Sequence, residues 1–434
     1  MLSAPVSALR TPDLRRQILL TLGLLAVYRL GAALPSPGVD YRAIHACAQQ
    51  AAGGDAGIYQ LINLFSGGAM LQLSVFAVGI VPYITASVIA QLLTVVVPRF
   101  EELRKQGSSG QATLTQYTRY LSVALAVLHA TGLVALAARG QLLHCAEPIL
   151  ADASVFGMII VVLVMTAGAA LVMWFGEQIT ERGVGNGMSL LIFAGIAARI
   201  PGEGKAILDS RGGLIFGLVC VGAFLVIVAV IFVEQGQRRI PVQYAKRVVG
   251  RKMYGGSSTY LPLKVNQAGV IPVIFASSLL YLPNLVSQLT QHDSGRWQAM
   301  IQRYLADVSS PVYLSVYFAL IVFFTYFYVA ITFDPRERAE EMRAFGGFLP
   351  GYRPGRPTAD HLSYVLGRIT LPGSIYLGAV AVLPNLLLST GSGGAGRNLL
   401  FAGSSALIVV SVGLDTIKQI ESRLMSRSYT GFLR

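Results

Sequence analysis

Long apolar stretches, separated by short polar segments, recur along the whole 434-residue chain. A helical stretch of about 20 apolar residues matches the roughly 30 Å hydrocarbon core of a bilayer. Hydrophobic residues make up 54% of the chain and charged residues only 13%, which is more apolar surface than a soluble domain can hide. The sequence therefore predicts an all-α polytopic membrane protein. We expect ten transmembrane helices, near residues 17–36, 73–97, 117–138, 154–175, 185–201, 213–234, 265–289, 311–333, 364–388 and 399–418.

The first apolar stretch follows Arg10, Arg15 and Arg16. A basic start before an apolar stretch is also typical of a secretory signal peptide. Its ending, GAALPSPG, contains no clear A-x-A cleavage site, and nine further spans follow it. We interpret it as a retained first helix.

Cysteine and histidine spacing gives no sign of a metal site. The three cysteines, Cys47, Cys145 and Cys220, form no C-x-x-C pattern, and the five histidines form no H-x-x-x-H pattern. A Cys47–Cys145 disulfide stays an alternative if their loops meet outside the membrane. We expect no metal and no cofactor.

The distribution of basic residues predicts the orientation. If the N-terminus is cytoplasmic, most of the 34 Lys and Arg fall on the inner side, as the positive-inside rule requires. Both termini are then cytoplasmic. Two inner loops, about 235–264 and 334–363, are longer and more basic than a connection needs. They face either anionic lipid headgroups or a large acidic or cytosolic partner such as ribosomal RNA or a motor protein.

One short pattern occurs in both halves of the chain. GIVPYITAS at residues 79–87 resembles GVIPVIFAS at residues 269–277, and both lie inside predicted spans. Matching Gly/Pro segments in two five-helix halves indicate an internal repeat, although Gly and Pro are frequent enough in membrane helices for a chance match. An odd number of spans per half makes the repeat inverted. We expect halves at 1–212 and 213–434, and helices that bend at Pro82 and Pro272.

The centres of the spans carry bulky apolar residues where a transporter of small solutes usually needs polar ones. No proton or sodium relay is visible there. An apolar waist suits a conduit that closes around varied chains and excludes water by dewetting. Just before the second span, IYQLINLFSGGAMLQL is too short to cross, so it is either an interfacial segment or a re-entrant stopper. The apolar waist residues are Ile80, Ile84, Met188, Ile192, Ile274 and Ile408.

No enzyme is indicated. The glycine-rich segment ERGVGNGMS, residues 181–189, lacks the G-K-[ST] ending of a phosphate-binding loop and follows a membrane span instead of a strand. We expect a tight inner turn there. Neither a pair of catalytic aspartates nor a Ser/His couple occurs at membrane depth.

Several longer motifs carry a family resemblance over nearly the full length. They are NLFSGGA, PYITASVIAQLL, PRFEELRKQG, GEQITERGVGNGMSLLIF, GQRRIPVQYAKR, STYLPLKVNQAGVIPVIFASS and FGGFLPGYRPGRPT. In this order they resemble the SecY family, the channel-forming subunits of the bacterial Sec translocon. The sequences of the motifs are most similar to those of actinobacterial members.

The resemblance implies two inverted halves around a central pore, with a lateral gate between the second and seventh spans. It places the six apolar waist residues in a pore ring, where Met188 departs from the isoleucine that the family favours. It implies gate positions at Thr85, Asn266 and Leu282. It assigns residues 60–72 to a plug, with Asn63, Phe65, Ser66, Gly67 and Gly68 at its centre.

The resemblance also implies partners. SecE would clasp the halves and SecG would be peripheral, while the ATPase SecA or a translating ribosome would supply energy and dock on the inner loops. The clients would be secretory and membrane-protein precursors in the cytoplasmic membrane, and no DNA binding is implied. Docking would involve Arg238, Arg239, Arg251, Lys252 and Arg353. The alternative function is a secondary transporter of a small solute with inverted-repeat architecture.

Overall fold

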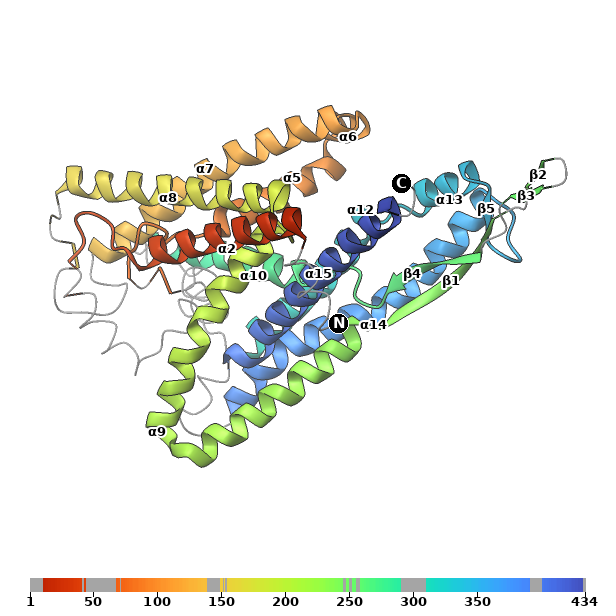
Figure 1. Ribbon diagram of the computed structural model, residues 1–434. Helices are drawn as coiled ribbons and strands as arrows, with labels where there is room; N and C mark the ends of the chain where they lie inside the picture. The colour runs from red at the N-terminus through yellow and green to blue at the C-terminus, as the bar shows by residue number, and fades with distance from the viewer. Residues whose placement is uncertain are drawn as a thin grey trace. The chain divides into compact units, whose positions relative to one another are not determined.

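The computed structural model describes most of the chain (Figure 1). Much of the predicted plug, including Asn63, Phe65, Ser66 and Gly67, lies outside the described residues, as do Arg251, Cys47 and Cys145. The described residues are 11–40, 43, 68–70, 72–138, 149–150, 152, 154–244, 247–249, 252–254, 258–289, 310–390 and 400–431.

The described residues are mostly helical, with short strands within residues 237–264 and 347–348 (Figure 1). The helices are α2 (Pro12–Ala33), α5 (Val81–Val96), α6 (Pro98–Lys105), α7 (Ser108–Ala138), α8 (Val155–Arg182), α9 (Gly187–Glu234), α10 (Ile271–Leu289), α12 (Pro311–Thr332), α13 (Pro335–Ala344), α14 (Arg356–Thr390) and α15 (Leu400–Gly431). The strands are β1 (Gln237–Tyr244), β2 (Arg247–Val249), β3 (Lys252–Tyr254), β4 (Ser258–Lys264) and β5 (Gly347–Phe348).

Each predicted span coincides with helix over most of its length. Spans five and six are the two parts of α9, which is interrupted at Gly212, where φ is 80° and ψ is 167°. Within the described ranges, six helices are long and apolar enough to cross a membrane, or seven if α5 and α6, which are bent by 98°, count as one span. Gly187–Gly202 and Ile271–Leu280 are shorter apolar helices.

The expectation that Pro82 and Pro272 bend helices is wrong. Residues 75–80 are turns, and α5 begins at Val81 with proline in its first turn. In the same way, α10 begins at Ile271, directly before Pro272. Proline lacks the N–H that a first turn leaves unpaired, and its φ is already helical, so it starts a helix without cost.

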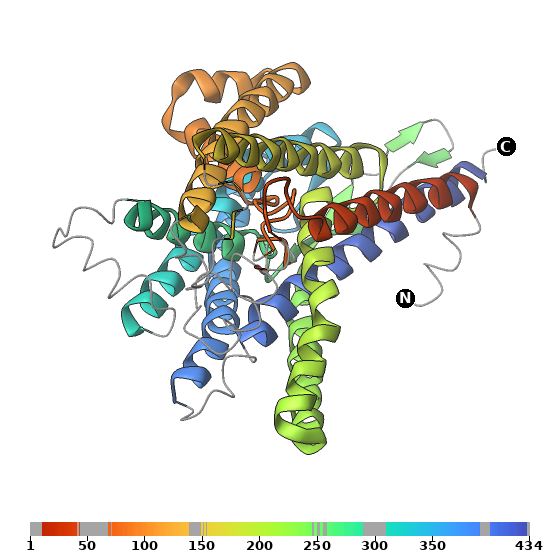
Figure 2. The same ribbon diagram turned by 90° about the vertical axis from the view of Figure 1, so that its left-hand side faces the viewer.

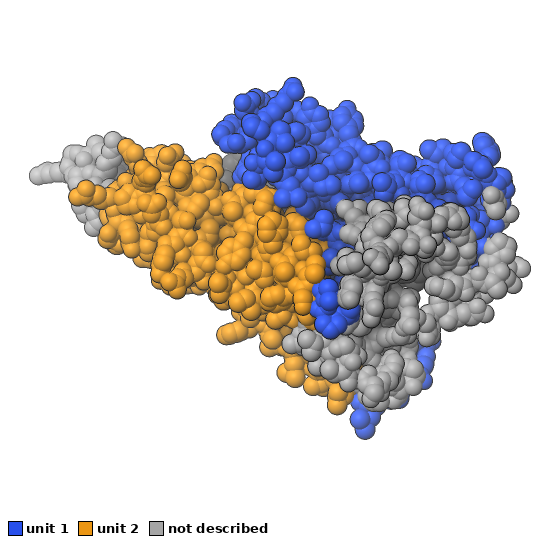
Figure 3. All heavy atoms as spheres, turned by 180° about the vertical axis from the view of Figure 1, so that it is seen from behind, with its two compact units in different colours: residues 1–217, 278–313, 408–434 blue, residues 218–277, 314–407 orange. Residues whose placement is uncertain are grey.

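The helices form two compact units, which Figure 3 colours separately. Unit 1 contains residues 1–217, 278–313 and 408–434, and unit 2 contains residues 218–277 and 314–407. The division into halves at residue 212 stays a prediction.

In unit 1, α5 packs against α7, and α7 lies beside α8 in both ribbon views (Figures 1 and 2). Its core joins Met70, near the end of the predicted plug, and Leu73, directly after it, to buried residues of α7 and α8. Ser154 caps α8 by accepting a 3.1 Å hydrogen bond from Gly157 N. Large apolar side chains on the outer faces remain exposed, such as Leu163 at 62%, as lipid contact requires.

In unit 2, both predicted inner loops contain strands that the sequence analysis did not predict. β4, β1 and β5 form one antiparallel sheet in that order, with Ile240 opposite Leu261 and Gln243 opposite Phe348. β5 comes from the second loop, so the sheet ties the two loops together. The unit 2 core includes Ile240 and Leu263 of the sheet together with residues of α12 and α14.

Candidate functional site

The two repeated segments have the same backbone geometry. Gly79 has φ of 60° and Gly269 has φ of 62°, a left-handed conformation that glycine adopts without strain. In both segments, the residue directly after the glycine accepts a hydrogen bond from the residue four positions further on. Ile84 N donates to the Ile80 carbonyl at 3.2 Å, and Ile274 N donates to the Val270 carbonyl at 3.3 Å. Ile84 and Ile274 are therefore equivalent, each the fourth residue of its helix. This agreement is much more specific than five matching letters.

Four of the predicted ring residues lie buried within unit 1. Ile80 and Ile192 are each 1% exposed, Ile84 is 7% exposed and Ile408 is 0% exposed. Ile274, which belongs to unit 2, is 5% exposed. All five are thus shielded apolar side chains, as a closed constriction requires. Because the ring draws on both units, its closure stays a prediction.

Met188 differs from the isoleucines, since it is only half buried. Its side chain packs against α8 at Gly176, where an added Cβ would lie 2.7 Å from the Met188 sulfur. A thioether on an unbranched chain fills such a narrow gap more easily than a β-branched side chain.

Two of the three predicted gate residues, Thr85 and Asn266, are held by side-chain hydrogen bonds. Thr85 is 5% exposed, and its hydroxyl donates to the Val81 carbonyl at 3.0 Å. Asn266 is 3% exposed, and its Nδ2 donates to Glu234 Oε1 at 2.6 Å and to the Gly269 carbonyl at 3.1 Å. Leu282 lies on α10. Asn266 thus connects the end of α9 to the turn that begins α10.

The Asn266–Glu234 contact was not predicted from the sequence. Glu234 is 8% exposed, and a buried carboxylate needs hydrogen bonds to remain charged. The signal in the sequence was a single acidic residue at the end of an apolar span. Its partner lies 32 positions away, so spacing alone did not identify it.

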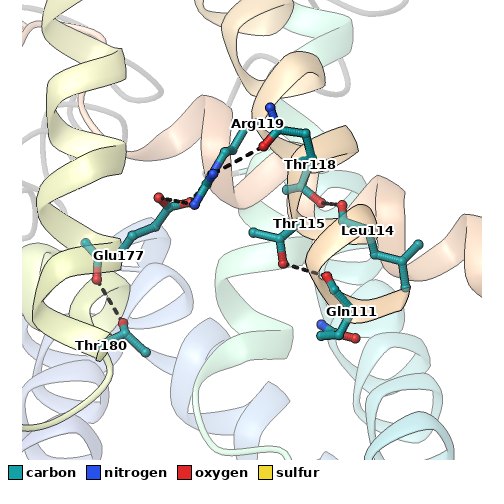
Figure 4. Close-up of polar contacts among 9 residues, drawn as sticks. Gln111, Leu114, Thr115, Thr118, Arg119, Glu177 and Thr180 are labelled. Carbon is teal, nitrogen blue, oxygen red and sulfur yellow. Dashed lines mark hydrogen bonds and ion pairs between the residues drawn. The ribbon is translucent and has the colours of Figure 1, made fainter. Parts of the chain in front are cut away.

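A second polar contact joins α7 to α8 (Figure 4). Arg119 Nε and Nη2 each donate to one oxygen of the Glu177 carboxylate at 2.9 Å, which is a bidentate pair. The side chain of Glu177 is 12% exposed and that of Arg119 is 37% exposed. The pair joins α8 to α7, and α7 in turn packs against α5, the first of the repeated helices.

The predicted docking residues of β1 lie on an exposed part of the sheet. Ile240 and Val242 point into the core, so alternation places Arg239 on the opposite, solvent face. The Arg239 guanidinium lies 4.8 Å from the ring centroid of Tyr260 on β4. Arg238 is also exposed, at the beginning of the strand. Lys252 begins β3, where it pairs with Val249.

Arg353 is presented by an ordered turn. Gly351 and Gly355 have φ of 89° and 104°, and the Thr358 hydroxyl donates to the Arg353 carbonyl at 2.8 Å. The Arg353 side chain is exposed. Because the sheet joins both inner loops, Arg353 and the β1 arginines belong to the same structural unit.

The short helix α6 also carries charged side chains. Lys105 pairs with Glu101 at 2.7 Å, and the hydrogen bond to Lys105 lowers the pKa of the Glu101 carboxyl. Both side chains are well exposed, so the pair contributes little to stability. Among the described residues, no group of three His, Cys, Asp or Glu residues is arranged to hold a metal ion.

Comparisons with known proteins relate the whole chain to one family. A family model described as SecY matches residues 74–417. A "Protein translocase subunit SecY" from Mycobacterium leprae is 68% identical, and one from Corynebacterium glutamicum is 56% identical, each over the full length of both chains.

Solved structures share the fold. One described as "The structure of a protein conducting channel" has a TM-score of 0.62 at 17% identity, covering 94% of this chain and 92% of that one. Sec61 in a canine ribosome–channel complex from the endoplasmic reticulum has a TM-score of 0.59 at 16% identity, with the same coverage of both chains. Because the family model matches residues 74–417 and a full-length relative is 68% identical, the chain belongs to the SecY family.

Proposed function

We propose that this chain is the protein-conducting channel of a Sec translocase. It passes unfolded secretory polypeptides across the cytoplasmic membrane and releases membrane-protein segments sideways through a gate. The observation that carries the proposal is the pair of repeated helix starts, with φ of 60° at Gly79 and 62° at Gly269, each presenting a buried isoleucine. The full-length relatives named as translocase subunits support it.

The apolar side chains explain how one channel serves many clients. Isoleucine and methionine offer no fixed hydrogen-bond pattern, so they do not select a sequence. They also leave water without partners, and a narrow apolar constriction therefore blocks ions at rest by dewetting. Ile80, Ile84, Met188, Ile192, Ile274 and Ile408 form this ring, and residues 60–72 act as the plug.

A small-solute transporter is less well supported. Transporters usually hold substrate and coupling ions with polar groups near the midplane. Here the residues at the repeated helix starts are apolar. The buried Glu234, at the end of α9, already accepts a hydrogen bond from Asn266. The TM-score of 0.62 to a structure described as a protein conducting channel also favours a polypeptide path.

The chain works with partners that supply energy. SecA or a translating ribosome docks on the sheet formed by the inner loops and on the Arg353 turn, with Arg238, Arg239, Arg251 and Lys252 contributing positive charge. SecE and SecG complete the complex. The chain itself catalyses no reaction, and both of its termini lie in the cytoplasm, with ten spans between them as is consistent with the family. Thr85, Asn266 and Leu282 lie along the gate.

The proposal is tested by crosslinking to a stalled client. Cys47, Cys145 and Cys220 are replaced, and a single cysteine is introduced at Ile84 or Ile274. A secretory polypeptide stalled partway through, with a cysteine in its translocating segment, should form disulfides with both positions. The matched control is Leu163→Cys on α8, because Leu163 is 62% exposed on an apolar surface.

Disulfides at both isoleucine positions and none at Leu163 are the expected result. Absence at both positions, with normal insertion of the variants, would overturn the channel assignment. Saturable uptake of one small solute by the purified protein would then favour the transporter.

A further inference from the structure

The turn between α8 and α9, residues 183–187, is tightly enclosed. A Cβ at Gly183 would lie 2.5 Å from the Thr21 hydroxyl, and one at Gly187 would lie 1.9 Å from the Gly176 carbonyl oxygen. Gly185 has φ of 91°, which favours glycine. Three glycines are needed here because the turn is surrounded on several sides, and this is more than a simple connection requires.

Hydrogen bonds from two neighbouring helices hold the backbone of the turn. Val184 N donates to the Thr21 hydroxyl of α2 at 3.1 Å, although the two residues are 163 positions apart. Gly187 N donates to the Thr180 hydroxyl of α8 at 2.9 Å. These bonds satisfy backbone groups that the end of one helix and the start of the next leave unpaired.

Arg423 completes this network from near the end of the chain. Its Nη1 donates to the Gly183 carbonyl at 2.9 Å and to Gln17 Oε1 at 2.7 Å. Gly183 is the C-cap of α8, where unpaired carbonyls attract a cation. One guanidinium therefore connects α2, the end of α8 and the part of α15 after residue 407, which all belong to unit 1.

The position of this contact relates it to the proposed ring. Met188 follows the turn directly, and Ile192 lies one helical turn further along α9. Ile408 lies on α15, the helix that carries Arg423. Thr416, also on α15, would lie 3.1 Å from a Cβ at Gly185, so α15 contacts the turn at a second point.

We propose that Arg423 is a positioning residue that fixes the start of α9 against α2 and α15, and so sets where Met188 and Ile192 lie relative to Ile408. The effect on the ring rests on the proposed function, while the effect on the turn does not. The rigid guanidinium presents the N–H groups of Nη1 to both acceptors in a fixed orientation, whereas the donors of a lysine ammonium rotate at the end of a flexible chain.

The test compares variants of the full-length chain, purified with its partner subunits and placed in lipid nanodiscs. Amide hydrogen exchange is measured for peptides covering residues 183–190. Arg423→Ala should raise exchange there by about tenfold, since two hydrogen bonds to a charged donor are lost. Arg423→Lys should give an intermediate value because one bond can be kept. Gln17→Ala, which leaves the Gly183 contact, should also be intermediate.

The matched control is Lys418→Ala, which removes a cation of the same helix whose side chain forms no hydrogen bond or ion pair with the other described residues. Its exchange should equal that of the unmodified protein. Unchanged exchange in Arg423→Ala, or equal increases in Arg423→Ala and Lys418→Ala, would overturn the positioning role.

Ion conductance at rest is the second readout, with Ile408→Gly as the reference for an opened ring. Conductance should increase in the order Lys418→Ala, Arg423→Lys, Arg423→Ala, at unchanged yield of the complex. Increased conductance in Ile408→Gly but not in Arg423→Ala would overturn the link between Arg423 and the ring. If Ile408→Gly conducts no more than the unmodified protein, the ring itself is wrong, and the exchange result alone then decides the role of Arg423 in the turn.

Discussion

Glu177 shows how a single charged residue becomes compatible with an apolar helix. Its carboxylate is mostly buried on α8, and the fork of Arg119 from α7 satisfies both of its oxygens at 2.9 Å. A pair of this kind need not add net stability compared with apolar residues, because desolvation opposes the attraction. Once Arg119 is removed, the mostly buried Glu177 carboxylate loses both of these hydrogen bonds. Arg119 is more exposed and also donates to Gln116 Oε1 at 3.2 Å, so Glu177 depends on Arg119 more than the reverse.

We expect Arg119→Ala to lower the free energy of unfolding by about 1 to 3 kcal/mol. The double variant Arg119→Met/Glu177→Gln should lower the free energy of unfolding less than Arg119→Ala does, since no unpaired charge remains. Unfolding in detergent of this double variant and of its two single variants, Arg119→Met and Glu177→Gln, forms a double-mutant cycle that measures the coupling between the two positions.

The control for this cycle is the exposed pair Arg338–Glu341, whose side chains are both 47% exposed. Arg338→Ala should cost no more than about 1 kcal/mol. Equal losses for Arg119→Ala and Arg338→Ala would show that burial does not strengthen the dependence between Arg119 and Glu177.

At the scale of elements, the beginnings of α5 and α10 show how the same short pattern forms the same structure twice. A glycine with positive φ reverses the chain, and a proline in the first turn then starts the helix. The pattern thus specifies a helix start and not a bend within a helix. This correction matters for function, because a helix that begins at Val81 or Ile271 places Ile84 and Ile274 in its first turns.

Gly269→Ala tests whether the helix start requires a residue with positive φ. Packing does not interfere, because no atom beyond the chain neighbours lies within 4 Å of the added Cβ. Forcing alanine to φ near 62° should lower the free energy of unfolding by about 1 to 2 kcal/mol. Gly269→Asn should lower the free energy of unfolding less than Gly269→Ala does, because asparagine tolerates the left-handed region.

The matched control is Gly367→Ala within α14, where the added Cβ also contacts nothing. There alanine favours the helix, so stability should stay equal or rise by up to about 1 kcal/mol. If thermal unfolding shows the same change for both alanine variants, backbone conformation is not the reason for glycine at residue 269.

At the scale of the whole molecule, the two inner loops are not independent. Gln243 of β1 pairs with Phe348 of β5, so residues more than 100 positions apart share one sheet. The Arg353 turn follows β5 directly, and the buried Leu349 anchors it. A partner that docks on either loop therefore contacts one ordered surface.

We expect Arg353→Glu to leave insertion and stability unchanged, because the side chain is exposed, while SecA-driven export falls at least about tenfold through lost charge attraction. Export of a secretory precursor into membrane vesicles measures this. Arg356→Glu is the control, since it makes the same charge change three residues away. Normal export in Arg353→Glu, or an equal loss in Arg356→Glu, would remove a specific role for Arg353.

The sequence by itself determined the membrane class, the positions of ten helices and the apolar character of the proposed ring, because bilayer thickness and side-chain polarity act locally. It also marked the repeated segments, although not that their prolines start helices. Only the tertiary structure decided the partners of Glu177, Glu234 and Arg423, and the sheet between the inner loops. These contacts join residues far apart in the chain, and neither periodicity nor spacing records which distant helix supplies a hydrogen-bond donor. A charge inside an apolar helix shows that a partner is needed, and only the fold shows which residue it is.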